Sequence, residues 1–447
     1  MPTAVHPHRA AAVLRSTALA AVLAASLPHT ALALDVAAAK AKIDASLAQS
    51  YPQLDAVYKD IHSHPELGFQ EVATAAKLAK EMRALGFEVT EKVGKTGIVA
   101  IYKNGPGPTV LVRTELDALP MEEKSGLPYA SKAVTNWNGA ETAVAHSCGH
   151  DIHMAAWLGT AKALLAMKSD WKGTLMFIGQ PSEETVTGAS AMLADGLFTR
   201  FGKPDVGFAL HVMSAPAGEV YYKPGVISSN SDSLEITFNG RGGHGSMPSA
   251  TIDPVMMAAR FVVDVQSVIS REKDASQFGV VTIGAIQGGS AGNIIPDSVL
   301  LRGTVRSYSP EVRKTLLGGI NRTAKAVADM AGAAAPDVKI INPSNAVVND
   351  ADLTERTAAV FRAAFGASAK VQPAPGSASE DYSEFIIAGV PSVFFSIGGY
   401  DLAKLTELRA AGKPVPVNHS PFFAPIPEPS IRTGVQAMTL AVLNVMQ

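Results

Sequence analysis

The sequence predicts an α/β fold, with a mostly parallel sheet covered by helices on both faces and an inserted ferredoxin-like α+β domain. Three features of the sequence predict this fold. Apolar runs typical of strands alternate with helical stretches, polar clusters follow three of these runs, and the order of elements changes near residue 224. Open α/β sheets bind ligands beyond the carboxyl ends of their strands, where these polar clusters lie.

The first part of the chain, residues 34–223, is expected to begin with two helices between residues 44 and 85, broken near His64 and Pro65. After them we expect a strand at 88–102, a strand at 109–113, a helix at 152–167, and strands at 173–180 and 206–212. The last three strands are apolar runs, and polar side chains lie at or just beyond their ends. This alternation favours parallel strands joined by helices.

From residue 224 the elements follow a different order. We expect a strand at 233–238, a helix at 254–269, strands at 280–286 and 299–308, a helix at 310–330 and a strand at 338–341. Strand-helix-strand-strand-helix-strand is the order of a ferredoxin-like domain. The α/β pattern then resumes with a helix at 352–365 and a strand at 392–396. Residues 224–342 are therefore expected to be inserted into a catalytic domain formed by residues 34–223 and 343–447.

The first 33 residues have the features of a secretory signal peptide. Arg9 and Arg15 precede an apolar run at 18–27, and Ala31-Leu32-Ala33 offers small residues at the spacing of signal cleavage. The run is too short for a comfortable permanent membrane span. We therefore expect an exported, periplasmic or secreted protein with no membrane span in its mature form. The alternative is a disordered, alanine-rich leader.

Composition limits the classes of partner. The chain has 447 residues, which suggests two domains, and 47% of them are hydrophobic, as in globular enzymes. The formal net charge of −2 gives no reason to expect nucleic acid or an anionic membrane as a partner. Small-molecule chemistry is the favoured class.

The single cysteine of the chain, Cys148, lies in the segment HSCGHDIH at 146–153. A thiolate beside imidazoles is a soft set of metal ligands. Gly149 permits a tight loop in which Cys148 and His150 converge on one ion. The alternative is a buried, inert cysteine, but the surrounding histidines favour metal binding.

Two adjacent carboxylates, Glu183 and Glu184, follow the expected strand at 173–180. Adjacent glutamates usually belong to a solvated surface. Here they lie at the expected ligand-binding edge, where one can bind a metal ion while the other acts as a general base.

Two further histidines complete the candidate metal ligands. His211 lies at the end of the strand at 206–212, and His419 lies in NHSPFF; either could instead be an ordinary polar residue. Five candidate ligands are enough for two metal ions that share one bridging ligand. The five are Cys148, His150, Glu184, His211 and His419.

Eight motifs are spread in order along the chain. They are HSHPELGFQE (62–71), RTELDALP (113–120), HSCGHDIH (146–153), QPSEE (180–184), GRGGHGSMP (240–248), GNIIPD (292–297), SEDYS (379–383) and NHSPFF (418–423). As an ordered set, they resemble the metal-dependent aminoacylase/carboxypeptidase family, in its branch of hippurate hydrolases and auxin-conjugate amidohydrolases. Each motif alone is weak, but the set extends over nearly the whole chain after residue 33.

The resemblance implies a pair of divalent ions bound by Cys148, His150, Glu184, His211 and His419. It implies that Cys148 bridges the two ions. Glu183 would be the general base that takes a proton from the attacking water and delivers it to the leaving amine. The ions could be zinc, manganese, cobalt or nickel, because thiolate, imidazole and oxygen donors accommodate all four.

The resemblance also implies that the inserted domain covers the site and mediates dimerisation, so a homodimer or higher homo-oligomer is expected. His244 would stabilise the oxyanion, in its own or a partner's site, and Asn293 would contact the substrate. Arg306 is expected to bind the substrate carboxylate, with a surface arginine as the alternative. Asp117 and Asp151 are expected to orient the metal ligands.

Three departures from the family pattern bear on specificity. Glu115 stands where the family usually has aspartate, and residues 185–187 replace an expected glycine. The stretch 402–416 is longer than usual, and we expect it to reshape the substrate pocket.

The favoured function is a metal-dependent amidohydrolase that cleaves the amide bond of an N-acyl amino acid, a hippurate-like or related conjugate. The alternatives are a metallo-carboxypeptidase or dipeptidase acting on short peptides, and a non-catalytic periplasmic binding protein. Glu183 argues against the binding protein, because a protein without chemistry needs no base beside a metal ligand. Redox sensing through Cys148 is disfavoured because the chain has no resolving cysteine.

Overall fold

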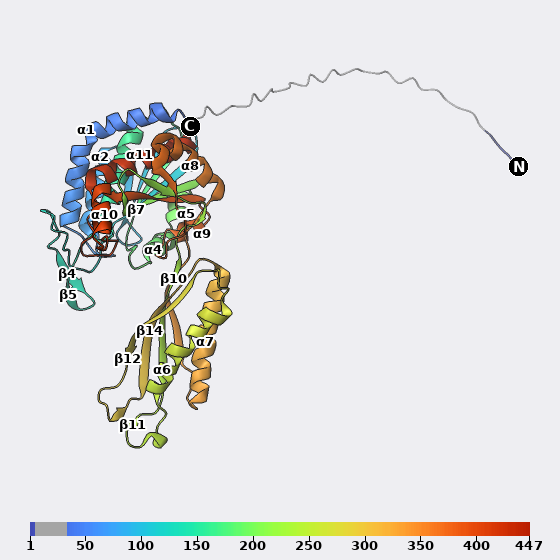
Figure 1. Ribbon diagram of the computed structural model, residues 1–447. Helices are drawn as coiled ribbons and strands as arrows, with labels where there is room; N and C mark the ends of the chain where they lie inside the picture. The colour runs from blue at the N-terminus through green and yellow to red at the C-terminus, as the bar shows by residue number, and fades with distance from the viewer. Residues whose placement is uncertain (5–33) are drawn as a thin grey trace. The chain divides into compact units, whose positions relative to one another are not determined.

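The computed structural model of the chain describes residues 1–4 and 34–447 (Figure 1). The expected signal peptide therefore lies outside the described residues, except for its first four. Among the residues described, no helix has the length and apolarity needed to cross a membrane.

One eight-stranded sheet forms the core of the larger part of the molecule (Figure 1). Its strands lie in the order β1 (Glu88–Val93), β2 (Gly97–Lys103), β6 (Thr174–Gln180), β3 (Thr109–Glu115), β7 (Val206–Pro216), β18 (Ser392–Tyr400), β8 (Val220–Tyr222) and β17 (Ala369–Val371). The four central strands β6, β3, β7 and β18 are parallel, whereas β2 and β8 run antiparallel to them. This is the mostly parallel sheet that the sequence predicts.

The register of the parallel strands brings their carboxyl ends to one edge of the sheet. Glu115 lies beside Gln180, and His211 lies beside Ser396. The loops that follow these strands therefore meet at this edge, as in other open α/β sheets.

Helices cover both faces of this sheet. One face packs against α1 (Val36–Ser63), α2 (Val72–Ala84), α3 (His150–Ala166), α8 (Ala351–Phe365) and α11 (Pro427–Met446). The other face packs against α4 (Gly188–Ala194), α5 (Leu197–Phe201) and α9 (Ser383–Ile387). Along β3, Val110 and Val112 enter the first core and Leu111 the second, because side chains alternate between the faces of a strand.

A second sheet of four antiparallel strands has a core of its own. Its strands lie in the order β12 (Gly279–Gln287), β14 (Ser298–Ser307), β10 (Asn230–Asn239) and β15 (Asp337–Ser344). Two helices pack on it, α6 (Pro254–Asp264) and α7 (Pro310–Met330), around buried residues such as Phe238, Phe261 and Leu316. Along the chain this gives the ferredoxin-like order of the expected inserted domain. Beyond the end of β10, β11 (Gly243–His244) pairs with β13 (Ile294–Ile295) (Figure 1).

Two expected elements were wrong in detail. The strand expected at 88–102 is a pair of antiparallel strands, β1 and β2, because Gly94 and Lys95 have left-handed backbone angles (φ 65° and 81°) and the chain turns back. A side chain at Gly94 would also lie 2.6 Å from the backbone nitrogen of Met192. The helix expected at 254–269 ends at Asp264, and a π-helical turn follows at Val268–Glu272.

The sequence patterns did not predict helix α11, helix α10 (Leu402–Ala410) or the hairpin of β4 (Val134–Trp137) with β5 (Ala140–Ala143). Most residues of α11 are buried, and its partly exposed polar residues, among them Glu428 and Arg432, form a stripe too narrow to stand out in the sequence. By contrast, α10 has Leu405 as its one buried residue, and the hairpin strands are too short to show alternation.

Candidate metal centre

Cys148 and His150 are placed by a tight turn that leads into α3. Gly149 has φ 91°, and a Cβ there would lie 2.4 Å from Cγ1 of Val212, so the turn requires glycine. Cys148 is buried, and His150 is the first residue of α3. The imidazole Nδ1 of His150 donates a hydrogen bond to the backbone oxygen of Asp117 (2.7 Å), which leaves its Nε2 free to bind a metal ion.

Glu183 and Glu184 lie in the loop after β6, beyond the edge where the parallel strands end. Ser182, just before them, has a left-handed backbone (φ 50°), and its N–H donates to the buried carboxylate of Glu71 (2.7 Å). The backbone N–H of Glu184 donates to Oδ2 of Asp117 (2.9 Å). The loop is therefore held in place by hydrogen bonds to two carboxylates.

The donor atoms of the five expected metal ligands converge in two groups that share Cys148. Within each group, every ligand atom lies within 4.8 Å of the others. The first group contains Cys148, His150 and His211, and the second contains Cys148, Glu184 and His419. The Cys148 sulfur lies 3.4 Å from Nε2 of His211, and Nε2 of His419 lies 3.3 Å from a Glu184 oxygen.

The chemistry of these residues fits divalent cations. Nε2 of His150 and Oε1 of Glu184 are buried without a hydrogen-bond partner among the described residues, an arrangement that is costly unless a ligand compensates. Burial would lower the pKa of His150, but the side chain of Asp117 and the carboxylates of Glu115 and Glu184 raise it to about 10. Burial, together with Glu184 and Glu183, raises the pKa of the Cys148 thiol. The site thus has a surplus of negative charge that a cation would offset.

Glu183 lies at the rim of both groups. Its Oε2 is 3.8 Å from Nε2 of His150, and the side chain is buried. Burial raises the pKa of Glu183 well above its ordinary value, and the carboxylates of Glu380, Glu184 and Asp381 raise it further. A carboxyl group with a raised pKa suits proton transfer near neutral pH.

A buried ionic network behind the site was not identified from the sequence. Arg113, within the apolar strand β3, donates to Glu115, to Oε1 of Glu380 (2.7 Å) and to Oε1 of Gln180 (2.9 Å). The carboxylate of Glu115 also accepts from Nδ1 of His153 (2.9 Å). A basic residue inside an apolar run, as in TVLVR, is the signal that could have revealed this network.

The two aspartates expected to orient the metal ligands differ in their contacts. Asp117 binds both His150 and the backbone of Glu184, as described above. No described hydrogen bond or ion pair joins the Asp151 side chain to the five candidate ligands; its carboxylate accepts from Nδ1 of His62 (2.6 Å) and from the backbone N–H of Ile152 (2.8 Å). His62 also binds the buried carboxylate of Glu123 (3.0 Å).

The candidate residues of the inserted domain lie in two places. His244 and Asn293 are exposed around the small sheet of β11 and β13, and the ring of His244 bonds with Ser246 (2.8 Å). No described hydrogen bond or ion pair joins His244 to the five candidate ligands. Arg306 is partly buried, and its Nη1 donates to the hydroxyl of Ser379 (2.7 Å), the residue before Glu380. The structure therefore brings Arg306, and not His244, beside a segment of the buried network.

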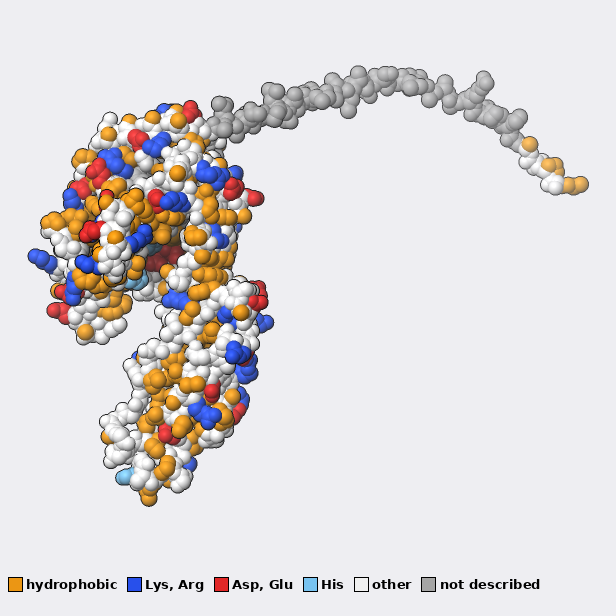
Figure 2. Space-filling model, in the orientation of Figure 1, with side chains coloured by type: hydrophobic (Ala, Val, Ile, Leu, Met, Phe, Trp, Pro, Cys, Tyr) orange, Lys and Arg blue, Asp and Glu red, His pale blue; other side chains and the backbone are white. Residues whose placement is uncertain are grey.

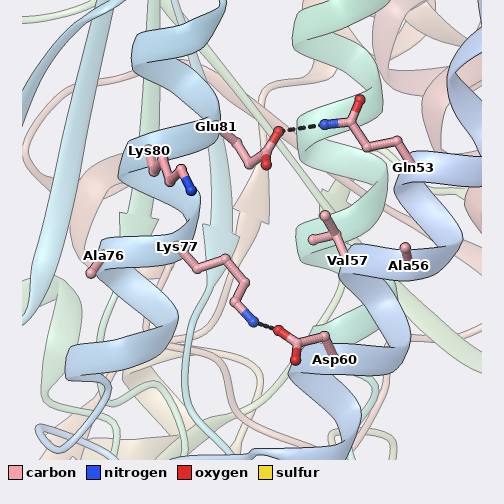
Figure 3. Close-up of a pocket in the computed structure, with 8 residues that line it drawn as sticks. All are labelled: Gln53, Ala56, Val57, Asp60, Ala76, Lys77, Lys80 and Glu81. Carbon is pink, nitrogen blue, oxygen red and sulfur yellow. Dashed lines mark hydrogen bonds and ion pairs between the residues drawn. The ribbon is translucent and has the colours of Figure 1, made fainter.

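Figure 2 shows acidic and histidine side chains gathered in a hollow of the larger part of the molecule. Two cavities lie elsewhere. One, of about 550 Å³ between α1 and α2, is lined by polar residues that pair with each other, among them Lys77 with Asp60 and Gln53 with Glu81 (Figure 3). None of the five candidate ligands lines it. The stretch 402–416 forms α10 and part of a second, largely apolar cavity of about 510 Å³.

Comparison with known proteins places this geometry in a family. Residues 111–442 match the pattern of Peptidase family M20/M25/M40. The chain belongs to this family. It is 36% identical over 340 residues to a hippurate hydrolase of Campylobacter jejuni, covering 74% of this chain and 85% of the relative. It is also 36% identical over 286 residues to an N-acetylcysteine deacetylase of Bacillus subtilis, covering 62% of this chain and 71% of that protein.

A solved structure supports the same assignment. The YxeP protein of Bacillus subtilis, described as a dinuclear metal-binding peptidase of the M20 family, superposes with a TM-score of 0.71 at 27% identity. The match covers 89% of this chain and 99% of that protein. The family resemblance inferred from the motifs is confirmed, and the M20 chain is a hydrolase that acts on amide bonds and binds divalent metal ions.

Proposed function

We propose that this M20 hydrolase cleaves the amide bond of N-acyl amino acids and that Cys148 joins two metal ions in its active site. One observation carries the proposal: Cys148 belongs to both groups of converging donor atoms, so one thiolate can serve two adjacent cations. The substrates named for two relatives, hippurate and N-acetylcysteine, are both N-acyl amino acids.

In this proposal, His150 and His211 would hold one ion, Glu184 and His419 would hold the other, and the Cys148 thiolate would be available to both. When bound there, the ions would supply Lewis-acid polarisation of the scissile carbonyl and would lower the pKa of water to about 7. The Glu183 carboxylate accepts a proton from the attacking water and then donates it to the leaving amide nitrogen. It has no competing hydrogen bond among the described contacts, which leaves its oxygens available for this transfer.

Three residues of the inserted domain contact the substrate in this proposal. The exposed His244 imidazole donates to the developing oxyanion, from its own chain or from a partner in a homodimer, and Asn293 binds nearby. Arg306 offers a planar pair of N–H groups to the free carboxylate of the amino acid. We further propose that residues 1–33 direct export and are removed.

The proposal is tested with purified protein stripped of metal by a chelator and reloaded with zinc, manganese, cobalt or nickel. A panel of aromatic N-acyl amino acids, aliphatic N-acyl amino acids and dipeptides should be assayed with each form. We expect release of the free amino acid from N-acyl substrates, loss of turnover after chelation and recovery on reloading. Full activity after exhaustive chelation would contradict the proposal. If dipeptides are cleaved faster than N-acyl amino acids, the substrates are short peptides instead.

A further inference from the structure

His153 is a buried histidine of α3 that is not among the five candidate metal ligands. Its Nδ1 bonds to Oε2 of Glu115 (2.9 Å), and its Nε2 bonds to the backbone nitrogen of Val212 (2.8 Å). A carboxylate only accepts hydrogen bonds, and a backbone N–H only donates them. His153 is therefore a neutral imidazole with its proton on Nδ1.

The peptide group held by His153 directly follows a candidate metal ligand. The backbone oxygen of Val212 accepts from Nδ1 of His211 (2.8 Å) and from Nδ2 of Asn418 (3.1 Å). Because Nδ1 of His211 is bound in this way, its Nε2 points toward the Cys148 sulfur. Asn418 is in turn the residue before His419. The backbone of one residue, Val212, thus bonds to His153 through its N–H, while its oxygen sets the aim of His211 and anchors the loop of His419.

Glu115 connects this contact to the buried network behind the site. One carboxylate oxygen accepts from His153, and the other accepts from Arg113, which also binds Glu380. Arg113 and Glu115 have no exposed side-chain surface, and His153 is 1% exposed. Glu115 thus joins β3 to α3 through its two carboxylate oxygens.

We propose that Glu115 and His153 are positioning residues that aim His211 at the metal centre. This inference rests on the proposed function, in which His211 is a metal ligand. Hydrogen-bond partners behind a metal ligand fix its orientation, and their loss typically lowers metal affinity about 10–100-fold.

We call the hydrogen-bonded chain from Arg113 through Glu115 and His153 to the Val212 N–H the relay. Each bond in it has a fixed donor and acceptor, so Glu115→Gln is a sharp test. Glutamine keeps the size of glutamate but replaces one acceptor oxygen with an NH₂ donor. If the NH₂ faces Arg113, two donors oppose each other. If it faces His153, the ring proton must move to Nε2, which then opposes the Val212 N–H. Either arrangement breaks one link of the relay, so we expect metal affinity to fall about 10–100-fold.

A second set of variants keeps the test informative if Glu115→Gln fails to fold. His153→Phe keeps a ring and removes both hydrogen bonds, whereas His153→Gln keeps one donor and one acceptor. We expect a loss of metal affinity of about 10–100-fold for His153→Phe and a smaller loss for His153→Gln. Thr160→Val is the matched control, because it removes a buried hydrogen bond to Ala156 in the same helix without touching the relay.

The measurements are zinc content in zinc-buffered solution, the visible absorption bands of the cobalt-loaded protein, and the unfolding temperature of the metal-free protein. His211→Ala serves as the reference. The proposal predicts lower zinc content and altered cobalt bands for His153→Phe, and wild-type values for Thr160→Val. If His211→Ala loses zinc while His153→Phe stays within about twofold of wild type, the relay proposal is wrong. If His211→Ala keeps both ions, the assignment of the metal centre itself is wrong.

Discussion

The candidate functional residues of the two domains differ in burial. At the edge of the eight-stranded sheet, Glu183 and His150 are buried and surrounded by charged partners. The four-stranded sheet has an apolar core, and His244 and Asn293 are exposed at the small sheet of β11 and β13. The side chains at the edge of the eight-stranded sheet are held in place by contacts within the chain. The exposed side chains of the inserted domain are available to contact a substrate or a second chain.

This difference separates two kinds of test. A change in the buried region should alter metal binding, proton transfer or stability, because each group there is fixed by several others. A change at the exposed residues should leave the fold and the metal content intact and affect turnover alone. The following predictions are ordered by the size of the expected effect.

The largest effect is expected for Glu183→Gln, which keeps the size of the side chain and removes its ability to accept a proton. Turnover should fall by about 10²–10⁴-fold, the range of general acid–base catalysis. Metal content should stay at the wild-type level, because Glu184 and the other ligands are unchanged. Steady-state kinetics and elemental analysis on the same preparation check both parts. An active, metal-loaded variant would remove Glu183 from the mechanism.

His244→Ala tests the exposed region. If His244 donates to the oxyanion, kcat should fall by about 10²–10³-fold, with unfolding temperature and metal content as in wild type. A mixture of His244→Ala and Glu183→Gln chains should regain activity if His244 acts in a partner's site. Wild-type kcat for His244→Ala alone would show that this residue does not take part in the chemistry.

The buried ion pairs of His62 make a prediction about stability. Burial alone would lower the pKa of His62, but hydrogen bonds to Asp151 and Glu123 raise it from 6.5 to about 10. The protonated form is thus favoured in the folded chain, so its contribution is fully present below pH 6.5 and is lost as the pH rises through about 10. His62→Phe should cost about 3–5 kcal/mol at pH 6, because two buried carboxylates lose their partner.

Urea unfolding of wild type and His62→Phe at pH 6 and pH 10 measures this contribution. The difference between the two proteins should shrink at the higher pH. A difference that stays constant or grows with pH would show that His62 is not protonated in the folded protein.

The smallest effect is expected on the surface of the four-stranded sheet. Arg302 and Glu235 form an ion pair at 2.7 Å between half-exposed side chains of β14 and β10. Arg302→Ala should cost less than about 1 kcal/mol, since water and salt screen such pairs. Urea unfolding checks this. If Arg302→Ala lowers the free energy of unfolding as much as His62→Phe does, the predicted difference between the buried and the exposed region is wrong.

The sequence was sufficient to predict the metal ligands where residues of the right chemistry lie in a recognisable motif or at the end of a predicted strand. Cys148 and His150 lie in a recognisable histidine-rich segment, and Glu184 follows an apolar strand, so their convergence could be expected from the sequence. The two antiparallel strands in place of one at 88–102 could not, because the apolar run of β2 continues from the alternating pattern of β1. Helix α11 was missed because most of its residues are buried, and the partly exposed polar stripe that includes Glu428 and Arg432 is narrow.

The relay from Glu115 to Val212 could not be predicted from the sequence for a different reason. Its members lie on β3, α3 and β7, and only the fold reveals that His153 reaches a backbone nitrogen 59 residues away. The sequence did mark Glu115 as a departure from the family pattern. It could not show that the longer side chain joins Arg113 to His153.

The most direct test of the metal centre is anomalous X-ray scattering from crystals of the zinc-loaded protein. The account predicts two peaks about 3.5–4 Å apart, both within bonding distance of the Cys148 sulfur, one beside His211 and the other beside His419. A single peak, or two peaks that do not share Cys148, would contradict it.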